Sequence, residues 1–191
     1  MIAGGPEGMI YDAWRFLLYG AVLLLTLFCF CTPADRKALF RPSVSVFSQL
    51  LAGLGLTAGI LSVVGAVNLL LTGSFSLFQF TRLSFQNAAV FLLFQLLVAV
   101  TEETLFRGYL LRWLQRRRIP PFGAIVLSAA LFGGLHWVFQ RDLIQLVMAT
   151  LLGLLFALVH IKWRRCTLWA LILAHFLYDT SVANIPFCIL I

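Results

Sequence analysis

Residues 47–72 read FSQLLAGLGLTAGILSVVGAVNLLLT, and this run of 26 residues carries no charged side chain. It is too long for a helix buried in a soluble core, and it has the length of a transmembrane helix, which needs about 20 apolar residues. Five further apolar runs have a similar character, at residues 14–31, 87–113, 122–139, 143–161 and 167–183. We therefore predict an all-α integral membrane protein with about six transmembrane helices in one bundle.

The composition supports this fold class. Of the 191 residues, 62% are hydrophobic and only 11% are charged, whereas a soluble domain has roughly 45–50% apolar residues. Six helices and their loops account for nearly the whole chain, which leaves no length for a separate soluble catalytic domain. Any chemistry must therefore take place within the helix bundle.

Basic residues predict the orientation of the bundle. The chain has 14 Lys and Arg against seven Asp and Glu. Ten of these basic residues lie in the first, third and fifth loops: Arg36, Lys37, Arg41, Arg112, Arg116, Arg117, Arg118, Lys162, Arg164 and Arg165. Because Lys and Arg concentrate on the cytoplasmic side of membrane helices, we expect a multi-pass protein of the cell (inner) membrane with loops 1, 3 and 5 in the cytoplasm and both termini outside. The distribution supplies no basic face for nucleic acid.

Six ionisable side chains lie near the middle of the predicted membrane: Glu102, Glu103, Arg107, His136, His175 and Asp179. Each such group costs about 2.5–3.5 kcal/mol on insertion scales and is a functional candidate by default. Counting about 1.5 Å per residue from the predicted helix ends puts them in one layer near the middle of the membrane, somewhat toward the cytoplasm. We expect this polar layer to be the functional site.

The spacing of these residues indicates which of them can form a pair and which can face a cavity. Glu103 and Arg107 are four residues apart, so they share a helix face and can form an ion pair. Glu102 points about 100° away from Glu103, which directs it toward a cavity. His175 and Asp179 are also four residues apart. A Glu and a His in such a layer can hold a water molecule while further donors face the oxyanion, an arrangement suited to hydrolysis.

Two pairs of glycines predict close packing. Gly55 and Gly59 form a G-x-x-x-G motif, which is typical of close contact between membrane helices. Gly133 and Gly134 lie just before His136. We expect them to let a neighbouring helix, or an extended peptide substrate, approach the polar layer.

Other kinds of site fit the sequence less well. Glu102, His136 and His175 could ligate zinc, although the H-E-x-x-H motif is absent and the three residues lie on three helices. A serine protease would need a Ser beside a His, but Ser181 lies six residues beyond His175 and the sequence has no G-x-S-x-G. An aspartyl protease would need a second membrane Asp besides Asp179. A proton-relaying transporter is an alternative, although the sequence shows no internal repeat.

Three segments resemble the motifs of one family. EETLFR at residues 102–107 resembles the EExxxR motif of the CPBP intramembrane proteases, which include the CAAX prenyl endopeptidase Rce1 and the bacterial Abi proteins. FGGLH at residues 132–136 is similar to the family's FxxxH motif, and HFLYD at residues 175–179 is similar to its HxxxN/D motif. The resemblance covers about residues 87–181, with the motifs in the family's order.

The resemblance implies a role for each residue of the polar layer. By this resemblance, Glu102 and His136 would activate a water molecule. Glu103 would pair with Arg107 and hold the third helix in place. His175 and Asp179 would stabilise the oxyanion.

One residue departs from the family pattern, because the better-studied members carry Asn at the position of Asp179. An ionised Asp cannot donate a hydrogen bond, so Asp179 must be protonated, orient His175 or ligate a metal. The family has been described as metalloproteases, but we expect hydrolysis without metal or other cofactor. Zinc held by Glu102, His136 and His175 is the alternative.

We therefore predict an intramembrane endopeptidase that cuts a peptide bond near the C-terminus of a membrane-associated or lipid-modified protein or peptide. Its expected partners are a substrate with a C-terminal membrane-associated segment and the membrane lipid. Prenylated CAAX proteins, C-terminal sorting tags and peptide precursors all fit this description. The alternative is a non-proteolytic membrane protein, either a proton-coupled transporter or a bacteriocin-immunity type.

The chain has no linker, so we expect a single structural domain. Within it, residues 1–86 would form two N-terminal transmembrane helices with their loops and complete the bundle. Residues 87–191 would form the CPBP-like catalytic core.

Overall fold

The computed structural model describes residues 13–40, 44–73, 80–83, 85–163, 165–183 and 185–188. Within these residues, five helices are long and apolar enough to cross a membrane, at Ala13–Phe30, Val46–Leu70, Gln86–Arg116, Pro121–Gln140 and Leu143–Lys162. A shorter apolar helix covers Leu168–Val182. The predicted all-α membrane bundle is confirmed, and each of these six helices coincides with a predicted apolar run to within a few residues.

The helices are numbered in chain order. They are α1 (Ala13–Leu25) with its π-helical extension η2 (Thr26–Phe30), α2 (Pro33–Phe40), α3 (Val46–Thr72), α4 (Phe85–Glu103), the π-helical segment η3 (Thr104–Leu110), α5 (Leu111–Arg116), α6 (Pro121–Gln140), α7 (Leu143–Lys162) and α8 (Leu168–Ala183). The segments α4, η3 and α5 form one continuous rod. Hydropathy could not predict α2, because this short helix is charged rather than apolar.

Local sequence signals explain the turn between α6 and α7. Helix α6 begins with Pro121 in its first turn, where the missing N–H costs nothing. It ends at Gln140, and the next residue, Arg141, adopts the left-handed conformation with φ of 54°. The Asp142 carboxylate then accepts hydrogen bonds from the backbone N–H groups of Ile144 and Gln145, at 2.8 Å and 3.4 Å. This N-cap starts α7 directly after α6, so the two helices run antiparallel.

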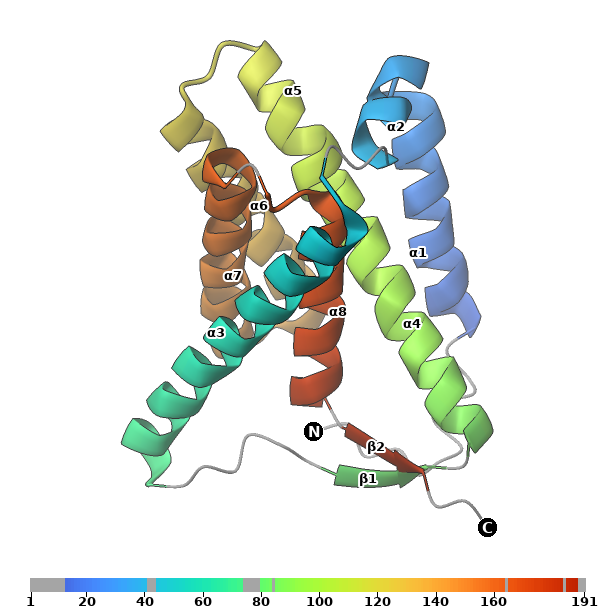
Figure 1. Cartoon of the computed structure of the whole chain (residues 1–191), viewed down its shortest axis with the longest axis vertical. Coiled ribbons are helices and arrows are strands. Elements are labelled where there is room, and N and C mark those ends of the chain that lie inside the picture. The colour runs from blue at the N-terminus through green and yellow to red at the C-terminus, as the bar shows by residue number, and fades with distance from the viewer. Residues whose placement is uncertain are drawn as a thin grey trace.

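Helix α8 is the centre of the bundle. It packs against α3 and α4, while α1 packs on α4 and α6 packs against α7 (Figure 1). Three of its residues, Ala170, Leu171 and Ala174, have no exposed surface. Two of the polar-layer residues lie on this helix, so their surroundings are formed by protein rather than by lipid.

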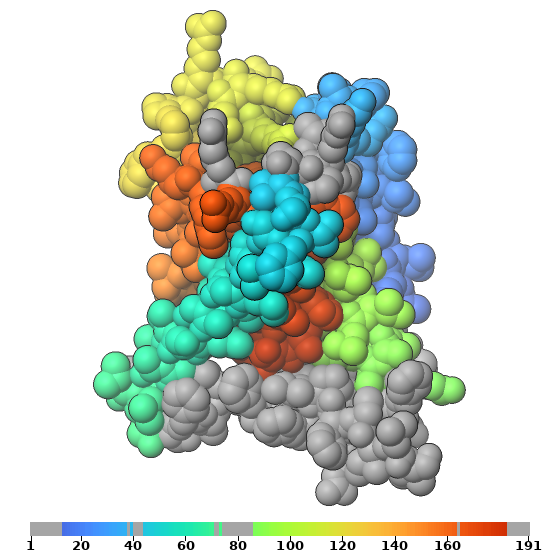
Figure 2. All heavy atoms as spheres, in the orientation of Figure 1, coloured from blue at the N-terminus to red at the C-terminus, as the bar shows by residue number. Residues whose placement is uncertain are grey.

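The first, third and fifth loops gather at one end of the molecule. Asp35 of α2 accepts hydrogen bonds from Arg116 at the end of α5, and Gln49 near the start of α3 donates to the carbonyl of Arg165 at 2.7 Å. In the space-filling view α2 and α5 both lie at the upper end (Figure 2). The hydrogen bonds from Arg116 hold the pKa of the Asp35 carboxyl well below its ordinary value. We call the end of the molecule at which the first, third and fifth loops gather the basic end.

Two short strands lie at the opposite end. Strand β1 (Phe80–Leu83) precedes α4, and strand β2 (Ile185–Cys188) follows α8. They pair in parallel, with Phe80 opposite Ile185 and Leu83 opposite Cys188. Four-residue strands give no recognisable periodicity, which is why the sequence predicted helices alone.

Glycine allows α6 and α7 to pack closely. A Cβ atom on Gly133 would overlap the Oγ1 atom of Thr150 and lie 2.9 Å from the carbonyl oxygen of Leu146. Gly134 differs, because among the described residues nothing lies within 4 Å of the Cβ position. Of the two, Gly133 therefore fulfils the prediction of a close helix neighbour.

The prediction that Gly55 and Gly59 pack against a helix was wrong for the described part of the chain. Nothing there lies within 4 Å of a Cβ atom built on either residue. The close contact of α3 is at Gly53 instead, whose Cβ position is 3.0 Å from the carbonyl oxygen of Ala170 on α8. A motif defined by spacing alone does not reveal which side of the helix meets its neighbour.

The difference between Gly133 and Gly134 predicts the outcome of a matched pair of substitutions. We expect Gly133→Ala to lower the free energy of unfolding by about 1–3 kcal/mol, because overpacking forces the helices apart. Gly134→Ala should leave it unchanged or raise it slightly, because Ala has the higher helix propensity. Thermal unfolding in detergent micelles measures both. Equal stability of the two variants would contradict the close packing of α6 on α7.

Candidate active site

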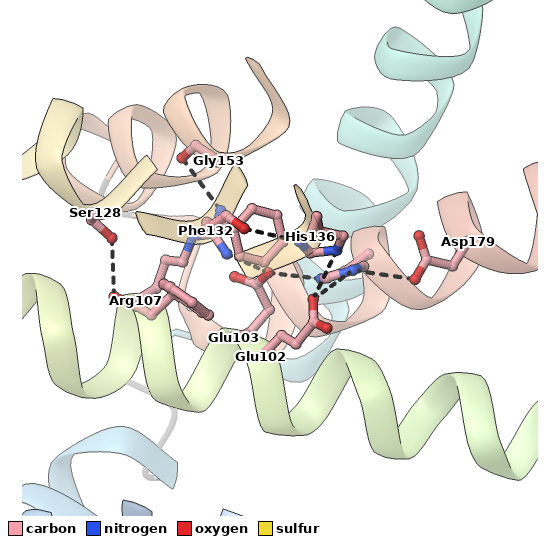
Figure 3. A network of polar contacts seen from close by, with 10 residues as sticks. Glu102, Glu103, Arg107, Ser128, Phe132, His136, Gly153 and Asp179 are labelled. Carbon is pink, nitrogen blue, oxygen red and sulfur yellow. Dashed lines mark hydrogen bonds and ion pairs between the residues drawn. The ribbon is translucent and has the colours of Figure 1, made fainter. Parts of the chain in front are cut away.

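The six ionisable residues of the polar layer lie together. Helix α4 and the segment η3 supply Glu102, Glu103 and Arg107, helix α6 supplies His136, and helix α8 supplies His175 and Asp179. In Figure 3 the side chains of Glu102, Glu103 and His136 point toward one another, with Arg107 and Asp179 on opposite sides of them. The four residues expected to act in catalysis, Glu102, His136, His175 and Asp179, all line one cavity of about 680 Å³.

His175 lies at the centre of the group. Its Nδ1 atom is 2.8 Å from Glu103 Oε1, and its Nε2 atom is 3.2 Å from Asp179 Oδ2. The Nε2 atom is also 3.7 Å from Glu102 Oε2. One imidazole therefore faces three carboxylates, two of them at hydrogen-bonding distance.

His136 is held in a defined orientation. Its Nδ1 atom is 2.9 Å from the backbone carbonyl oxygen of Phe132, one helical turn earlier. A carbonyl oxygen can only accept, so Nδ1 carries the proton, and in the neutral ring Nε2 has a free lone pair. That Nε2 atom lies 3.9 Å from Glu102 Oε2.

Glu102 presents its two oxygens to different neighbours. Oε1 accepts a hydrogen bond of 3.2 Å from the phenolic hydroxyl of Tyr19 on α1. Oε2 faces the Nε2 atoms of His136 and His175, and among the described residues it has no hydrogen-bond partner. The carboxylate is almost fully buried, so Oε2 is a strong acceptor directed into the cavity.

Glu103 and Arg107 form a buried ion pair behind these residues. Arg107 Nη1 donates to Glu103 Oε1 at 2.9 Å, and Nη2 donates to the carbonyl oxygen of Gly153 on α7 at 3.3 Å. The guanidinium lies 4.6 Å from the ring centre of Phe132 and 5.4 Å from that of Phe156. The spacing of four residues predicted this pair. The structure adds that Glu103 Oε1 also contacts His175, so the pair touches the catalytic candidates.

The backbone changes its helical geometry at the EETLFR motif. Helix α4 ends at Glu103 and the π-helical segment η3 begins at Thr104. Such π-helical turns inside α-helices occur frequently at functional sites. This change was not predicted from the sequence, although Gly108 within η3 is a weak helix former.

The helix bounds place the polar layer near the middle of the bundle. Glu102 lies close to the middle of the continuous helix Gln86–Arg116, and His175 lies close to the middle of α8. His136 and Asp179 lie nearer the ends of α6 and α8 that are away from the basic end, whereas Arg107 lies nearer the basic end.

Tyr19 is the site residue that sequence reasoning missed. A phenol is tolerated in a membrane helix, so hydropathy gives no reason to single it out. Its position is fixed by Phe94 of α4, whose ring packs edge-on against it at 5.7 Å. Thr101 donates a hydrogen bond of 3.3 Å to the Tyr19 carbonyl oxygen. Only the docking of α1 on α4 brings the hydroxyl to Glu102.

The described residues contain no group of three or more His, Cys, Asp or Glu side chains arranged as ligands of a metal ion. The alternative ligand set of Glu102, His136 and His175 is present as neighbours, with the distances given above. The distance between Glu102 and His136 allows one water molecule to bridge them.

Comparison with known proteins identifies the family. The model of the type II CAAX prenyl endopeptidase Rce1-like family matches residues 84–181, slightly more than half of the chain. No curated protein and no solved structure gives a match. The matched segment contains all six residues of the polar layer, in the order of the family motifs. The chain belongs to the Rce1-like family of type II CAAX prenyl endopeptidases.

Proposed function

We propose that this protein is an intramembrane endopeptidase that hydrolyses a peptide bond near the C-terminus of a membrane-associated or lipid-modified protein or peptide. The observation that carries the proposal is the position of Glu102 Oε2, a buried carboxylate oxygen that faces two imidazoles across a cavity. Membership of the Rce1-like family supports this reaction class.

Glu102 and His136 are suited to activate a water molecule. Their facing atoms are 3.9 Å apart, so one water oxygen can lie at about 2.8 Å from both. Glu102 takes a proton from this water, and the hydroxide attacks the carbonyl carbon of the substrate. When the C–N bond breaks, the same proton passes to the leaving amine, which restores the carboxylate.

His175 is suited to stabilise the oxyanion. An imidazole with a carboxylate oxygen at each nitrogen can donate to both only when it carries both protons. Its Nδ1–H then donates to Glu103, and its Nε2–H is shared between Asp179 and the oxyanion. In this scheme Asp179 orients His175, which accounts for an Asp where an Asn donor was expected.

We propose that the reaction needs no metal. Incubation with a chelator such as EDTA, followed by its removal, should change the rate of cleavage by less than about twofold. A fluorogenic peptide assay in detergent, with a parallel sample that receives Zn²⁺, measures the effect. Loss of cleavage with the chelator and its return with Zn²⁺ would show that the reaction needs a metal, for which Glu102, His136 and His175 are the candidate ligands.

Tyr19 should position the general base. We expect Tyr19→Phe to lower kcat by about tenfold with little change in KM, because the loss of one hydrogen bond of roughly 1–1.5 kcal/mol lets Glu102 rotate. The Phe ring keeps the packing against Phe94, so thermal unfolding should be unchanged. The contrary result, full activity of Tyr19→Phe, would mean that Glu102 is held by its other neighbours alone.

The substrate can be found by comparing protein C-termini. Membrane and secreted proteins from cells that express wild type or Glu102→Ala would be analysed by mass spectrometry of C-terminal peptides. A substrate should appear uncut only with Glu102→Ala, provided detergent gel filtration shows that the variant is folded. Identical processing in both strains would argue for a non-proteolytic role.

A further inference from the structure

Most of the cavity lies in one half of the bundle, although its lining on α4 and η3 runs from Phe94 to Phe106 and so reaches past the middle of that helix. Helices α1 and α7 contribute their first halves, from Trp14 to Val22 and from Gln145 to Leu152. Helices α6 and α8 contribute their last halves, from Phe132 to Gln140 and from His175 to Val182. Because α1 and α7 begin where α6 and α8 end, all four halves lie at the same end of the molecule. This is the end opposite the basic loops.

Side-chain exposure decreases in steps from this end inward. The Asp179 side chain is 27% exposed and that of His136 is 16% exposed. His175 is 8% exposed, and Glu103 behind it is fully buried. The exposed fraction therefore falls with distance from the end of α8, as expected if solvent and substrate approach from there.

The path toward the basic end is closed. Arg107 is 1% exposed and lies between the rings of Phe132 and Phe156. Beyond it, a cluster of buried apolar residues fills the space between α5, α6 and α7: Leu111, Leu114, Ala124, Ile125 and Ala157. Among the described residues, the lining of the cavity reaches the protein surface at the end of α6 and the start of α1, where Gln140 and Trp14 are exposed. We take this place as the mouth of the cavity.

Polar side chains continue from the catalytic candidates to the mouth. Gln95, Gln140 and Gln145 line the cavity together with the apolar residues, and Gln140 is exposed at the end of α6. A peptide backbone inside a membrane must have its hydrogen bonds satisfied. Amide side chains along the path supply donors and acceptors for an extended peptide.

We infer that the substrate enters this cavity from the non-cytoplasmic side of the membrane, and that it is a membrane-anchored polypeptide whose cleavage site has already been translocated. The inference rests on the proposed peptidase function and on the ten basic residues of loops 1, 3 and 5, which the positive-inside rule assigns to the cytoplasm. Prenyl groups are attached to C-terminal Cys residues in the cytoplasm. A prenylated CAAX protein would therefore meet the closed end, whereas a precursor with a translocated cleavage site would meet the mouth.

Accessibility of introduced thiols tests the inference without any substrate. Gln145→Cys places a thiol at the mouth, Met148→Cys places one inside the cavity, and Gln115→Cys is the matched control at the basic end. The background would carry Cys29→Ser and Cys188→Ser. The native Cys31 and Cys166 can stay, because they are only 5% and 2% exposed.

Each variant would be expressed in a bacterial host and treated with a membrane-impermeant sulfonated maleimide. In intact spheroplasts we expect labelling of Gln145→Cys and Met148→Cys at least tenfold faster than labelling of Gln115→Cys. In inverted vesicles the order should reverse. Detergent gel filtration would show whether each variant is folded. If one of the two cavity variants, Gln145→Cys or Met148→Cys, does not fold, the other still tests the same path.

Two results would overturn the inference. In one, Gln145→Cys and Met148→Cys react only in inverted vesicles, which would make the mouth cytoplasmic. In the other, Met148→Cys reacts from neither side although Gln145→Cys does, which would mean that the path is closed to polar molecules. Repeating the labelling in a Glu102→Gln protein separates the two proposals, since labelling needs no peptidase activity while substrate processing does.

Discussion

Glu102→Gln should lower kcat for peptide cleavage by about 10²–10⁴-fold, the range expected for loss of a general base. The amide has nearly the same shape as the carboxylate and can still accept from Tyr19, but it cannot take a proton from water. KM should change little, because the substrate contacts along the cavity remain. The rates would be compared with a fluorogenic peptide or with the native substrate once its C-terminus is known.

Glu102→Asp is the matched control for this experiment. It keeps the carboxylate but withdraws it by one methylene from His136 and His175. We expect activity between that of wild type and that of Glu102→Gln, with the same gel-filtration profile in detergent. If Glu102→Gln retained more than about a tenth of the wild-type kcat, the assignment of Glu102 as the base would be wrong.

Arg107→Met should lower the free energy of unfolding by about 3–5 kcal/mol, the cost of leaving one member of a buried ion pair without its partner. The Glu103 side chain is fully buried, so its charge cannot turn to solvent. The substitution also removes the hydrogen bond to Gly153 of α7. Unfolding in detergent micelles, followed by circular dichroism, measures the loss.

The double variant Glu103→Gln with Arg107→Met should recover much of this stability, because both charges are then gone. The four proteins form a double-mutant cycle, and the two substitutions should be coupled by more than about 1 kcal/mol. The double variant should nevertheless cleave slowly, because Glu103 also contacts His175. Additive effects on stability would contradict the ion pair, and full activity would contradict a role of Glu103 in holding His175.

The sequence predicted the helices and the six residues of the polar layer for a simple physical reason. Each apolar run of membrane length predicts one helix independently of the others. An ionisable group within such a run has a high free-energy cost of insertion, so it indicates a functional residue. The ion pair of Glu103 and Arg107 was also predictable, because both residues lie on one helix and the spacing determines their relative direction. Each of these features is local in the chain.

The contacts between helices were not predictable in this way. His175 contacts Glu103, and Tyr19 contacts Glu102, only because of how the helices are rotated and shifted against one another. The hydropathy of a single helix predicts neither its rotation nor its shift against its neighbours. The packing of Gly133 has the same origin, since only the position of α7 distinguishes it from Gly134.

The strand pair bears on how the protein is made. Strand β1 comes before α4 and strand β2 comes after α8, so the segment that holds all six ionisable residues of the polar layer is closed into a ring by backbone hydrogen bonds. During synthesis β2 and α8 emerge from the ribosome after every other described element. His175 and Asp179 arrive with α8, so the nascent chain has no complete site until its last helix is inserted. A membrane protease assembled in this order cannot cut its neighbours while it is still being built.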